Sequence, residues 1–174
     1  GQAVQDVPFE KLEQHLLADK QVLRFAGKRN VVIGIGSLKG VARDDAQLAS
    51  KKGWIYSNSK SPFIEYGYRH DGNAQKGKLS AKFSVKLAKS GSYEVRMHYT
   101  SDPNRATNVP VAIRHAGGEA KVVVNQRKDP AGNGGYHVLG TYDFKAGQSA
   151  NVTISNEATD GYVIIDCIQW LPKP

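Results

Sequence analysis

Residues 144–170 read FKAGQSANVTISNEATDGYVIIDCIQW, a stretch that constrains the architecture more than any other part of the chain. It has the pattern of a strand, a turn and a closing strand. From Val163 to Trp170 the closing strand carries β-branched and aromatic residues at both even and odd positions. A strand that is apolar on both faces has to be covered on both faces. The pattern therefore predicts a closing strand that lies between the layers of a packed β-sandwich.

Upstream of this stretch, apolar residues recur at every second position, which is the period of a strand with one buried face. Leu79 to Leu87 and Tyr93 to Tyr99 alternate in this way on either side of a turn, and we expect them to pair as antiparallel neighbours. Further alternating runs are Val109 to Ile113, Val122 to Val124, Leu139 to Phe144 and Val152 to Ser155. A pair of glycines marks a turn between the first and the second of these runs. This spacing predicts an all-β antiparallel sandwich with a jelly-roll-like arrangement.

The N-terminal part of the chain follows a different period. Pro8 suits the first position of a helix, and apolar residues from Phe9 to Leu16 then recur at helical spacing. We therefore expect one short N-terminal α-helix that continues to about Leu23. The segment from Gly27 to Gly40 is expected to be a strand or an extended connector.

A chain of 174 residues fits one domain with a sizeable core. We predict that residues 1–38 form the helix and a linker and that residues 39–174 form the sandwich. A formal net charge of +8 favours an anionic partner. The one cysteine, Cys167, excludes a disulfide framework. No stretch approaches the roughly 20 apolar residues that a membrane span requires, and no signal peptide is expected at Gly1.

No constellation of residues in the sequence indicates catalysis. No serine lies in a GxSxG context, and the histidines lack the spacing of a zinc site. The sequence VVIGIGSLKG, residues 31–40, resembles a dinucleotide fingerprint, but antiparallel strand patterns follow it instead of a crossover helix. Tyr68, Arg69 and His70 are the residue types of a polysaccharide lyase site, yet neighbours on an extended chain point to different faces. We therefore expect no catalytic residues and no cofactor.

Five aspartates could supply hard oxygen ligands to a metal ion: Asp44, Asp45, Asp71, Asp160 and Asp166. No contiguous calcium-binding loop contains them. Surface carboxylates and turn-forming side chains are the favoured interpretation, so no metal site is predicted. A structural calcium ion that holds a loop stays open as the alternative.

The loops between the strands carry residues that suit a sugar ligand, because a sugar stacks its CH face on a ring and bonds planar polar groups through its hydroxyls. The predicted ligand-binding residues are Tyr68, Arg69, His70, Arg105, Asn108, Tyr136 and His137. The two tyrosines are predicted as stacking surfaces. The arginines suit carboxylate or sulfate groups, which a planar guanidinium binds in bidentate fashion. A basic solvent face is also predicted, with Lys78, Lys82, Lys86, Arg96 and His98.

Three segments resemble the golvesin C-terminal type of domain, also described as the xanthan lyase carbohydrate-binding-domain-like module. They are GWIYSNSKSPFIEYGYRHD at 53–71, SGSYEVRMHYTSDPNRATNVPVAI at 90–113 and TDGYVIIDCIQWLP at 159–172. The resemblance runs from about Lys39 to Pro172 and keeps the order and spacing of the family. The loop from Gln126 to Gly135 departs from the family pattern.

The resemblance implies a β-sandwich accessory module of secreted or envelope bacterial proteins. These include xanthan lyases, amidases and FAD-dependent oxidoreductase-like proteins, especially of planctomycetes. DVPFEKLEQHLLADKQVL, residues 6–23, is similar to the region before the module in the oxidoreductase-like members. The chain would then be the tail of a larger enzyme. The resemblance marks YRHD at 68–71 and NRATNVPV at 104–111 as site or loop-organising residues.

These observations lead to one expected function and several alternatives. We expect a noncatalytic carbohydrate-binding-like module, secreted or in the cell envelope, that tethers an attached enzyme to an anionic polysaccharide. One alternative is a structural domain that packs on the catalytic domain of its own chain and binds no glycan; an exposed apolar patch with Phe9, Leu12 and Leu16 would favour it. Another is a polysaccharide-degrading enzyme. Nucleic acid is not expected as a partner, since no recognition motif accompanies the basic charge.

Overall fold

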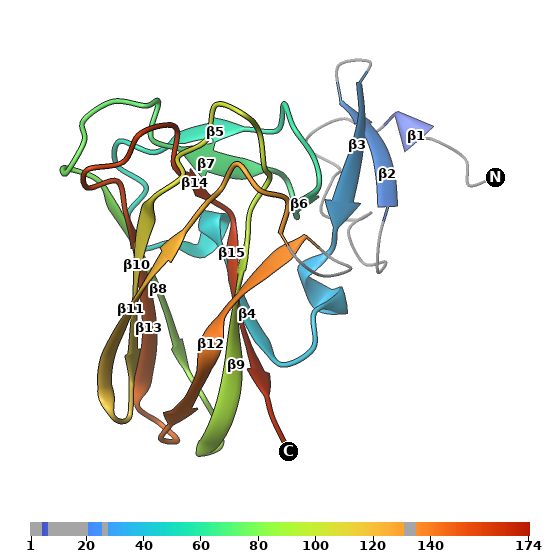
Figure 1. The fold of residues 1–174 in the computed structure, drawn as a ribbon. Helices are drawn as coiled ribbons and strands as arrows, with labels where there is room; N and C mark the ends of the chain where they lie inside the picture. Colours follow the sequence, from blue (N-terminus) through green and yellow to red (C-terminus); the bar gives the residue numbers. More distant parts are fainter. Residues whose placement is uncertain (1–4, 7–20, 26–27, 131–134) are drawn as a thin grey trace.

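Two four-stranded sheets form the body of the computed structural model, which describes residues 5–6, 21–25, 28–130 and 135–174 (Figure 1). One sheet has the order β11-β10-β13-β8, with the strands Gly118–Val124, Val109–His115, Ser149–Ser155 and Ser80–Lys86. The other has the order β12-β9-β15-β4, with the strands Tyr136–Phe144, Gly91–His98, Cys167–Pro172 and Val41–Asp44. All neighbouring strands in these two sheets are antiparallel. The predicted all-β antiparallel sandwich is confirmed.

The core lies between the two sheets and follows the period-two pattern. On β8, Ala81, Phe83 and Val85 are buried while the serines and lysines between them are exposed. On β9, Tyr93, Val95 and Met97 are buried in the same core. The alternating sequence therefore places one apolar face of each strand inward.

The closing strand β15 occupies the place that its sequence predicts, because it pairs with β9 on one side and with β4 on the other. Its residues Cys167 to Trp170 are all buried. Trp170 packs in the main core, whereas Cys167 points to the other face and packs with Ile33 and Ile64. A side chain on either face of this strand is thus covered by protein.

Two smaller sheets flank the sandwich. One has the order β14-β7-β5, with the strands Ile164–Ile165, Tyr68–His70 and Ile55–Ser57. The other has the order β1-β2-β3-β6, with the strands Gln5–Asp6, Gln21–Phe25, Lys28–Ile33 and Phe63–Ile64. Two short 3₁₀ helices, η2 at Ile35–Ser37 and η3 at Asp45–Gln47, lie on either side of β4.

The expected pairing of 79–87 with 93–99 is wrong. β8 pairs with β13, whereas β9 pairs with β12 and β15, so the two strands lie in opposite sheets. Each strand has one buried face, and that face is covered equally well by a facing sheet as by a neighbour's side chains. Alternation therefore predicts both strands but does not distinguish side-by-side pairing from face-to-face packing.

The expected N-terminal helix falls mostly on residues 7–20, which lie outside the described part of the chain. Its predicted end is wrong, since Gln21 to Leu23 belong to β2. Within the described ranges no helix has seven or more residues. The segment from Gly27 to Gly40 was expected to be a strand or an extended connector. It includes the strand β3, which pairs with β6 through Val32 and Ile33.

Candidate functional site

Long loops gather at one end of the sandwich, the upper end in Figure 1, opposite the short hairpins and the C-terminus. They include residues 71–79, 99–108 and 156–163. Two of them are joined by backbone hydrogen bonds: the Ala106 N–H donates to the Tyr162 carbonyl at 2.9 Å, and the Tyr162 N–H donates to the Asn104 carbonyl at 3.0 Å. Segments more than 50 residues apart in sequence therefore form one continuous surface.

Asp160 is exposed on this surface and contacts two other segments of the chain. Its carboxylate accepts hydrogen bonds from the Thr107 N–H at 2.6 Å and the Thr107 hydroxyl at 2.7 Å, and lies 3.6 Å from Arg127 Nη2. The hydrogen bonds from Thr107 lower the pKa of Asp160. Asn108 holds the same segment, because its amide donates to the Ala158 carbonyl and accepts from the Asp160 N–H. The predicted residue Asn108 thus organises the loop.

Tyr68 and Arg105, both predicted as ligand-binding residues, lie together but inside the protein. Arg105 Nη2 donates to the Tyr68 hydroxyl at 3.3 Å, and the guanidinium carbon lies 5.6 Å from the centre of the tyrosine ring. Arg105 also donates to the Thr100 carbonyl and the Asn104 side chain. The two residues are 1% and 5% exposed. Tyr68 therefore presents no open ring face for stacking, and both residues support the loops from below.

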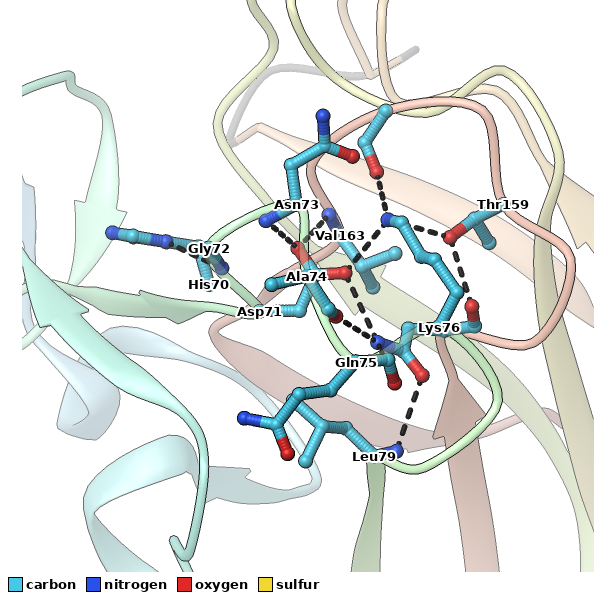
Figure 2. A network of polar contacts seen from close by, with 12 residues as sticks. His70, Asp71, Gly72, Asn73, Ala74, Gln75, Lys76, Leu79, Thr159 and Val163 are labelled. Carbon is cyan, nitrogen blue, oxygen red and sulfur yellow. Dashed lines mark hydrogen bonds and ion pairs between the residues drawn. The ribbon is translucent and has the colours of Figure 1, made fainter.

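His70 and Tyr162, which are both half-buried, form a ring pair next to Tyr68 and Arg105 in the fold. Their ring centres are 5.7 Å apart in an edge-on arrangement. His70 Nδ1 accepts a hydrogen bond from the Gly72 N–H at 3.0 Å (Figure 2). Burial, and then the nearby charge of Arg105, lower the pKa of His70. At neutral pH the imidazole is therefore uncharged, and its Nε2 carries the proton.

A lysine holds two of the loops together from within, as Figure 2 shows. Lys76 Nζ lies 2.8 Å from Asp71 Oδ2, 2.9 Å from the Thr159 hydroxyl and 2.6 Å from the Gly161 carbonyl. Asp71 Oδ1 in turn accepts from the Val163 N–H at 3.0 Å. An ammonium group surrounded by three oxygens therefore fixes the 71–79 loop against the 156–163 loop.

Arg69 lies on the opposite face of β7 from Tyr68, as expected for neighbours on a strand. Its Nε forms an ion pair with Asp45 Oδ2 at 2.8 Å, and its guanidinium carbon lies 5.9 Å from the ring centre of Tyr56. Tyr68, Arg69 and His70 therefore do not converge on one point, as the sequence predicts for neighbours on an extended chain.

Tyr136 and His137 begin β12 and belong to a separate set of contacts. The guanidinium carbon of Arg96 lies 4.0 Å from the ring centre of Tyr136, and the His98 ring centre lies 5.8 Å from it. His137 is the neighbour of Met97 in the ladder, and burial lowers its pKa. None of the hydrogen bonds or ring contacts described for these residues joins them to the loop surface.

The predicted basic solvent face is wrong in its membership. Lys82 and Lys86 are exposed on β8, whereas Arg96 and His98 lie on β9 in the other sheet. His98 is 2% exposed, and its Nε2 lies 3.2 Å from Gln169 Oε1. His98 is the ladder neighbour of Cys167 on β15, and Cys167 is covered by Ile33 and Ile64. The same outer face is therefore buried at both strands.

The expectation of surface or turn-forming aspartates holds only in part: four of the five are buried, but Asp44 and Asp71 do accept turn bonds, from the N–H groups of Ala46 and Asn73. Asp44, Asp45, Asp71 and Asp166 are buried, and Asp160 is exposed. Asp44, Asp45 and Asp166 each offer an oxygen to a group in which these atoms lie within 4.8 Å of one another. Among the described residues, this is the group of carboxylates that could hold a metal ion.

Sequence reasoning did not identify Lys76, Thr159, Asp160 or Tyr162 as site residues. The contacts of Lys76 with Thr159 and Gly161 span 83 and 85 residues of sequence. A turn signal at Asp160 and Gly161 marks the place but not its partners.

No helix in the described part of the chain has the length and apolarity to cross a membrane.

Residues 41–171 match the model of the Golvesin C-terminal domain family. A xanthan lyase of Bacillus sp. (strain GL1) is 36% identical over 131 residues, which are 74% of this chain and 14% of that protein. The solved structure of Paenibacillus xanthan lyase has a TM-score of 0.67 and 38% identity, covering 76% of this chain and 13% of that one. The chain thus spans about one seventh of the length of these relatives.

The fold also resembles a family 35 carbohydrate-binding module, Xyl-CBM35, solved in complex with a disaccharide that contains glucuronic acid. The TM-score is 0.53 at 16% identity, and the match covers 78% of this chain and 95% of that one.

Proposed function

This chain belongs to the Golvesin C-terminal domain family, and from that membership we propose that it is a noncatalytic carbohydrate-binding module for an acidic polysaccharide. The homologous xanthan lyases are larger enzymes, of which this chain matches a small part. Tethering raises the concentration of substrate near an attached enzyme without new chemistry. The attached enzyme, which the resemblance suggests is an FAD-dependent oxidoreductase-like protein or a lyase, belongs to the same proposal. So does a location outside the cytoplasm.

The loop surface at one end of the sandwich is the observation that carries the proposal. It carries two pairs of side chains, the half-buried rings of His70 and Tyr162 and the exposed groups of Arg127 and Asp160, and backbone hydrogen bonds join the segments of Tyr162 and Gln126 to Ala106. Rings beside planar polar groups suit the CH faces and hydroxyls of a sugar. We propose that Tyr162 and His70 contact the sugar ring and that Arg127 binds a carboxylate.

The acidic class of the ligand rests on charge. Arg127 is 42% exposed at its side chain, and the chain carries a formal net charge of +8. A guanidinium binds a carboxylate through two parallel hydrogen bonds. The solved relative Xyl-CBM35 holds a disaccharide with glucuronic acid, which is such a ligand.

A binding role fits the carboxylate at this surface better than catalysis does. A general acid needs a pKa raised toward the working pH. The hydrogen bonds from Thr107 instead lower the pKa of Asp160, so this carboxylate stays ionised at neutral pH. Four carboxylates have raised pKa values: Asp44, Asp45 and Asp166 are buried, and the half-buried Glu65 accepts a hydrogen bond from the Ile35 N–H.

The residues predicted from sequence enter the proposal in different roles. His70 stays a proposed ligand contact, whereas Tyr68, Arg105 and Asn108 are proposed to hold the loops in position. Tyr136 and His137, together with Arg96, remain a proposed second contact region on β12 and β9. Arg69 is proposed to act through Asp45 and not on the sugar.

Affinity gel electrophoresis tests the proposal with three polymers: polyglucuronate, polygalacturonate and neutral dextran. We expect retardation by at least one uronic polymer and not by dextran. Tyr162→Ala and Arg127→Ala should each weaken binding about tenfold, because each removes a contact of about 1.4 kcal/mol. Lys121→Ala is the matched control, since it removes one exposed positive charge from β11. Equal weakening in Lys121→Ala and Arg127→Ala would show diffuse charge attraction and would overturn the proposed site.

A second candidate function is favoured by a different observation. Ile55 and Tyr56 on β5 are 52% and 39% exposed; as neighbours on a strand they put an exposed apolar side chain on each of its faces, and such side chains offer a surface for an attached domain. The patch that was expected to indicate such packing, with Phe9, Leu12 and Leu16, lies outside the described residues. If no polymer retards the chain, a structural domain that packs on an attached catalytic domain becomes the better explanation.

A further inference from the structure

Three carboxylates meet in the interior of the protein, and none of them is among the residues proposed above to contact a sugar. Asp44 ends β4, Asp45 begins η3, and Asp166 lies between β14 and β15. The three residues are 4%, 3% and 1% exposed. One oxygen from each lies within 4.8 Å of the others. Chain segments more than 100 residues apart thus bring like charges together in the interior.

The hydrogen bonds around the cluster do not satisfy it. Asp44 Oδ2 accepts from the Ala46 N–H at 2.9 Å, but the buried Asp44 Oδ1 has no hydrogen-bond partner among the residues that the structure describes. Asp166 accepts from one donor, the Ile64 N–H, at 3.3 and 3.1 Å from its two oxygens. An unpaired buried polar atom costs free energy, and an unpaired buried charge costs more.

The charges around the cluster do not balance either. Arg69 forms an ion pair with Asp45 at 2.8 Å. Within the described ranges, Asp44 and Asp166 form no such ion pair. Burial, followed by the neighbouring acids, raises the pKa of Asp44 and of Asp166 well above the ordinary value. Glu65 adds a further negative charge nearby, whereas Lys51 adds a positive charge near Asp45. A positive ion would relieve this repulsion.

We propose that Asp44, Asp45 and Asp166 bind one calcium ion. Carboxylate oxygens are the ligands that Ca²⁺ prefers, at 2.3–2.6 Å from the ion. Two oxygens on the same ion are then at most about 5 Å apart, which agrees with the 4.8 Å limit for this group. The unpartnered Asp44 Oδ1 supplies a ligand that costs no existing hydrogen bond. Soft-metal ligands do not enter the group, which consists of carboxylates alone.

The ion would have a structural role. It joins the edge strand β4 and the helix η3 to the start of the closing strand β15. Asp166 also holds the backbone of β6 through the Ile64 N–H, and Asp45 holds Arg69 on β7. Calcium bound here would connect both small sheets to the sandwich. The inference does not depend on the proposed glycan function.

Calcium content and thermal unfolding of the purified chain test the inference. After treatment with EGTA and exchange into metal-free buffer, the chain is titrated with CaCl₂ alone and, separately, with MgCl₂. We expect about one calcium ion per chain by elemental analysis. A hundredfold excess over the dissociation constant should raise Tm by roughly 5–10 °C. Mg²⁺ should raise it less, because it demands a tighter octahedral arrangement.

Two variants and one control locate the site. Asp166→Asn and Asp44→Asn should each lose the calcium-dependent shift. Asp143→Asn, on an exposed position of β12, removes the same charge elsewhere and should keep it. No retained calcium and an unchanged Tm in the wild-type chain would overturn the proposal, whether or not the variants fold. An equal calcium shift in Asp44→Asn would overturn it as well, since the ion would then bind elsewhere.

Discussion

Gln126 binds the backbone of Ile164 through both ends of its side-chain amide. Its Nε2 donates to the Ile164 carbonyl at 2.8 Å, and its Oε1 accepts from the Ile164 N–H at 2.8 Å. Gln126 is fully buried. One side chain thus completes the edge of β14 as a neighbouring strand would.

Gln126→Ala should lower the free energy of unfolding by about 2–4 kcal/mol, because it leaves two buried backbone groups without partners. Urea denaturation monitored by circular dichroism measures the change. Gln148→Ala, at an exposed turn position, should change stability by less than about 0.5 kcal/mol. Equal effects of the two substitutions would contradict the assigned role of Gln126.

Lys76→Met should destabilise the chain by about 3 kcal/mol, because it leaves the buried Asp71 carboxylate without its cation. The double variant Lys76→Met with Asp71→Asn should recover part of the loss, since no buried charge then remains. A thermodynamic double-mutant cycle gives the coupling between the two residues. Additive effects would show that the 2.8 Å ion pair contributes nothing of its own.

Stability should fall as the pH decreases below about 4, in part through Asp71. Burial raises the pKa of Asp71, but the hydrogen bonds from Lys76, Val163 and other donors outweigh it and hold the pKa below the ordinary value of 3.8. A depressed pKa in the folded state stabilises the protein above the unfolded value, and this contribution is lost as the pH falls through the folded pKa. Urea midpoints measured from pH 5 to pH 2 should fall less steeply for Asp71→Asn than for the wild type.

Trp170→Ala should cost about 3–5 kcal/mol, the range for removing a large aromatic side chain from a core. Trp170 is fully buried in the inner strand β15, and no described residue forms a hydrogen bond with its indole Nε1. Trp170→Phe should cost much less than Trp170→Ala. It loses less buried volume, and it also removes the unsatisfied N–H donor. Guanidinium denaturation of both variants provides the comparison, and a Phe variant as unstable as the Ala variant would refute this account.

Arg69→Gln should strengthen calcium binding roughly tenfold, because it removes a positive charge that competes for Asp45. Burial dominates the environment of Asp45 and raises its pKa to about 7, whereas Arg69 acts in the opposite direction. The midpoint of a CaCl₂ titration followed by Tm measures the effect. Weaker binding in this variant would mean that Arg69 positions the ligand instead of competing with the ion.

The strands could be predicted from sequence because burial of one face imposes a local period. The doubly apolar run ending in Trp170 likewise predicts a strand covered on both sides, and β15 is such a strand. The partner of each strand could not be predicted, since side-by-side pairing and face-to-face packing demand the same alternation. β8 and β9 illustrate this limit, because they lie in opposite sheets.

For the candidate site, the sequence predicts some of the residues but not how they are arranged in space. Arg105 and Tyr68 do meet, 37 residues apart in sequence, but a sequence does not show that their contact is buried. Lys76 was missed because two of its three oxygen partners, Thr159 and Gly161, lie in a loop 83–85 residues away. The burial of Asp44 and Asp45 was missed because a pair of aspartates after a short strand has the same composition as a surface turn.

The central position of β15 affects how the domain is made. The last strand of the sandwich in sequence order, β15, inserts between β9 and β4, which come much earlier. During synthesis, the sheet that contains them stays incomplete until residue 172 has left the ribosome. Such distant pairings also slow folding, since the chain must close long loops before it gains the contacts. We therefore expect the nascent domain to be most exposed to proteases and chaperones until the final strand emerges.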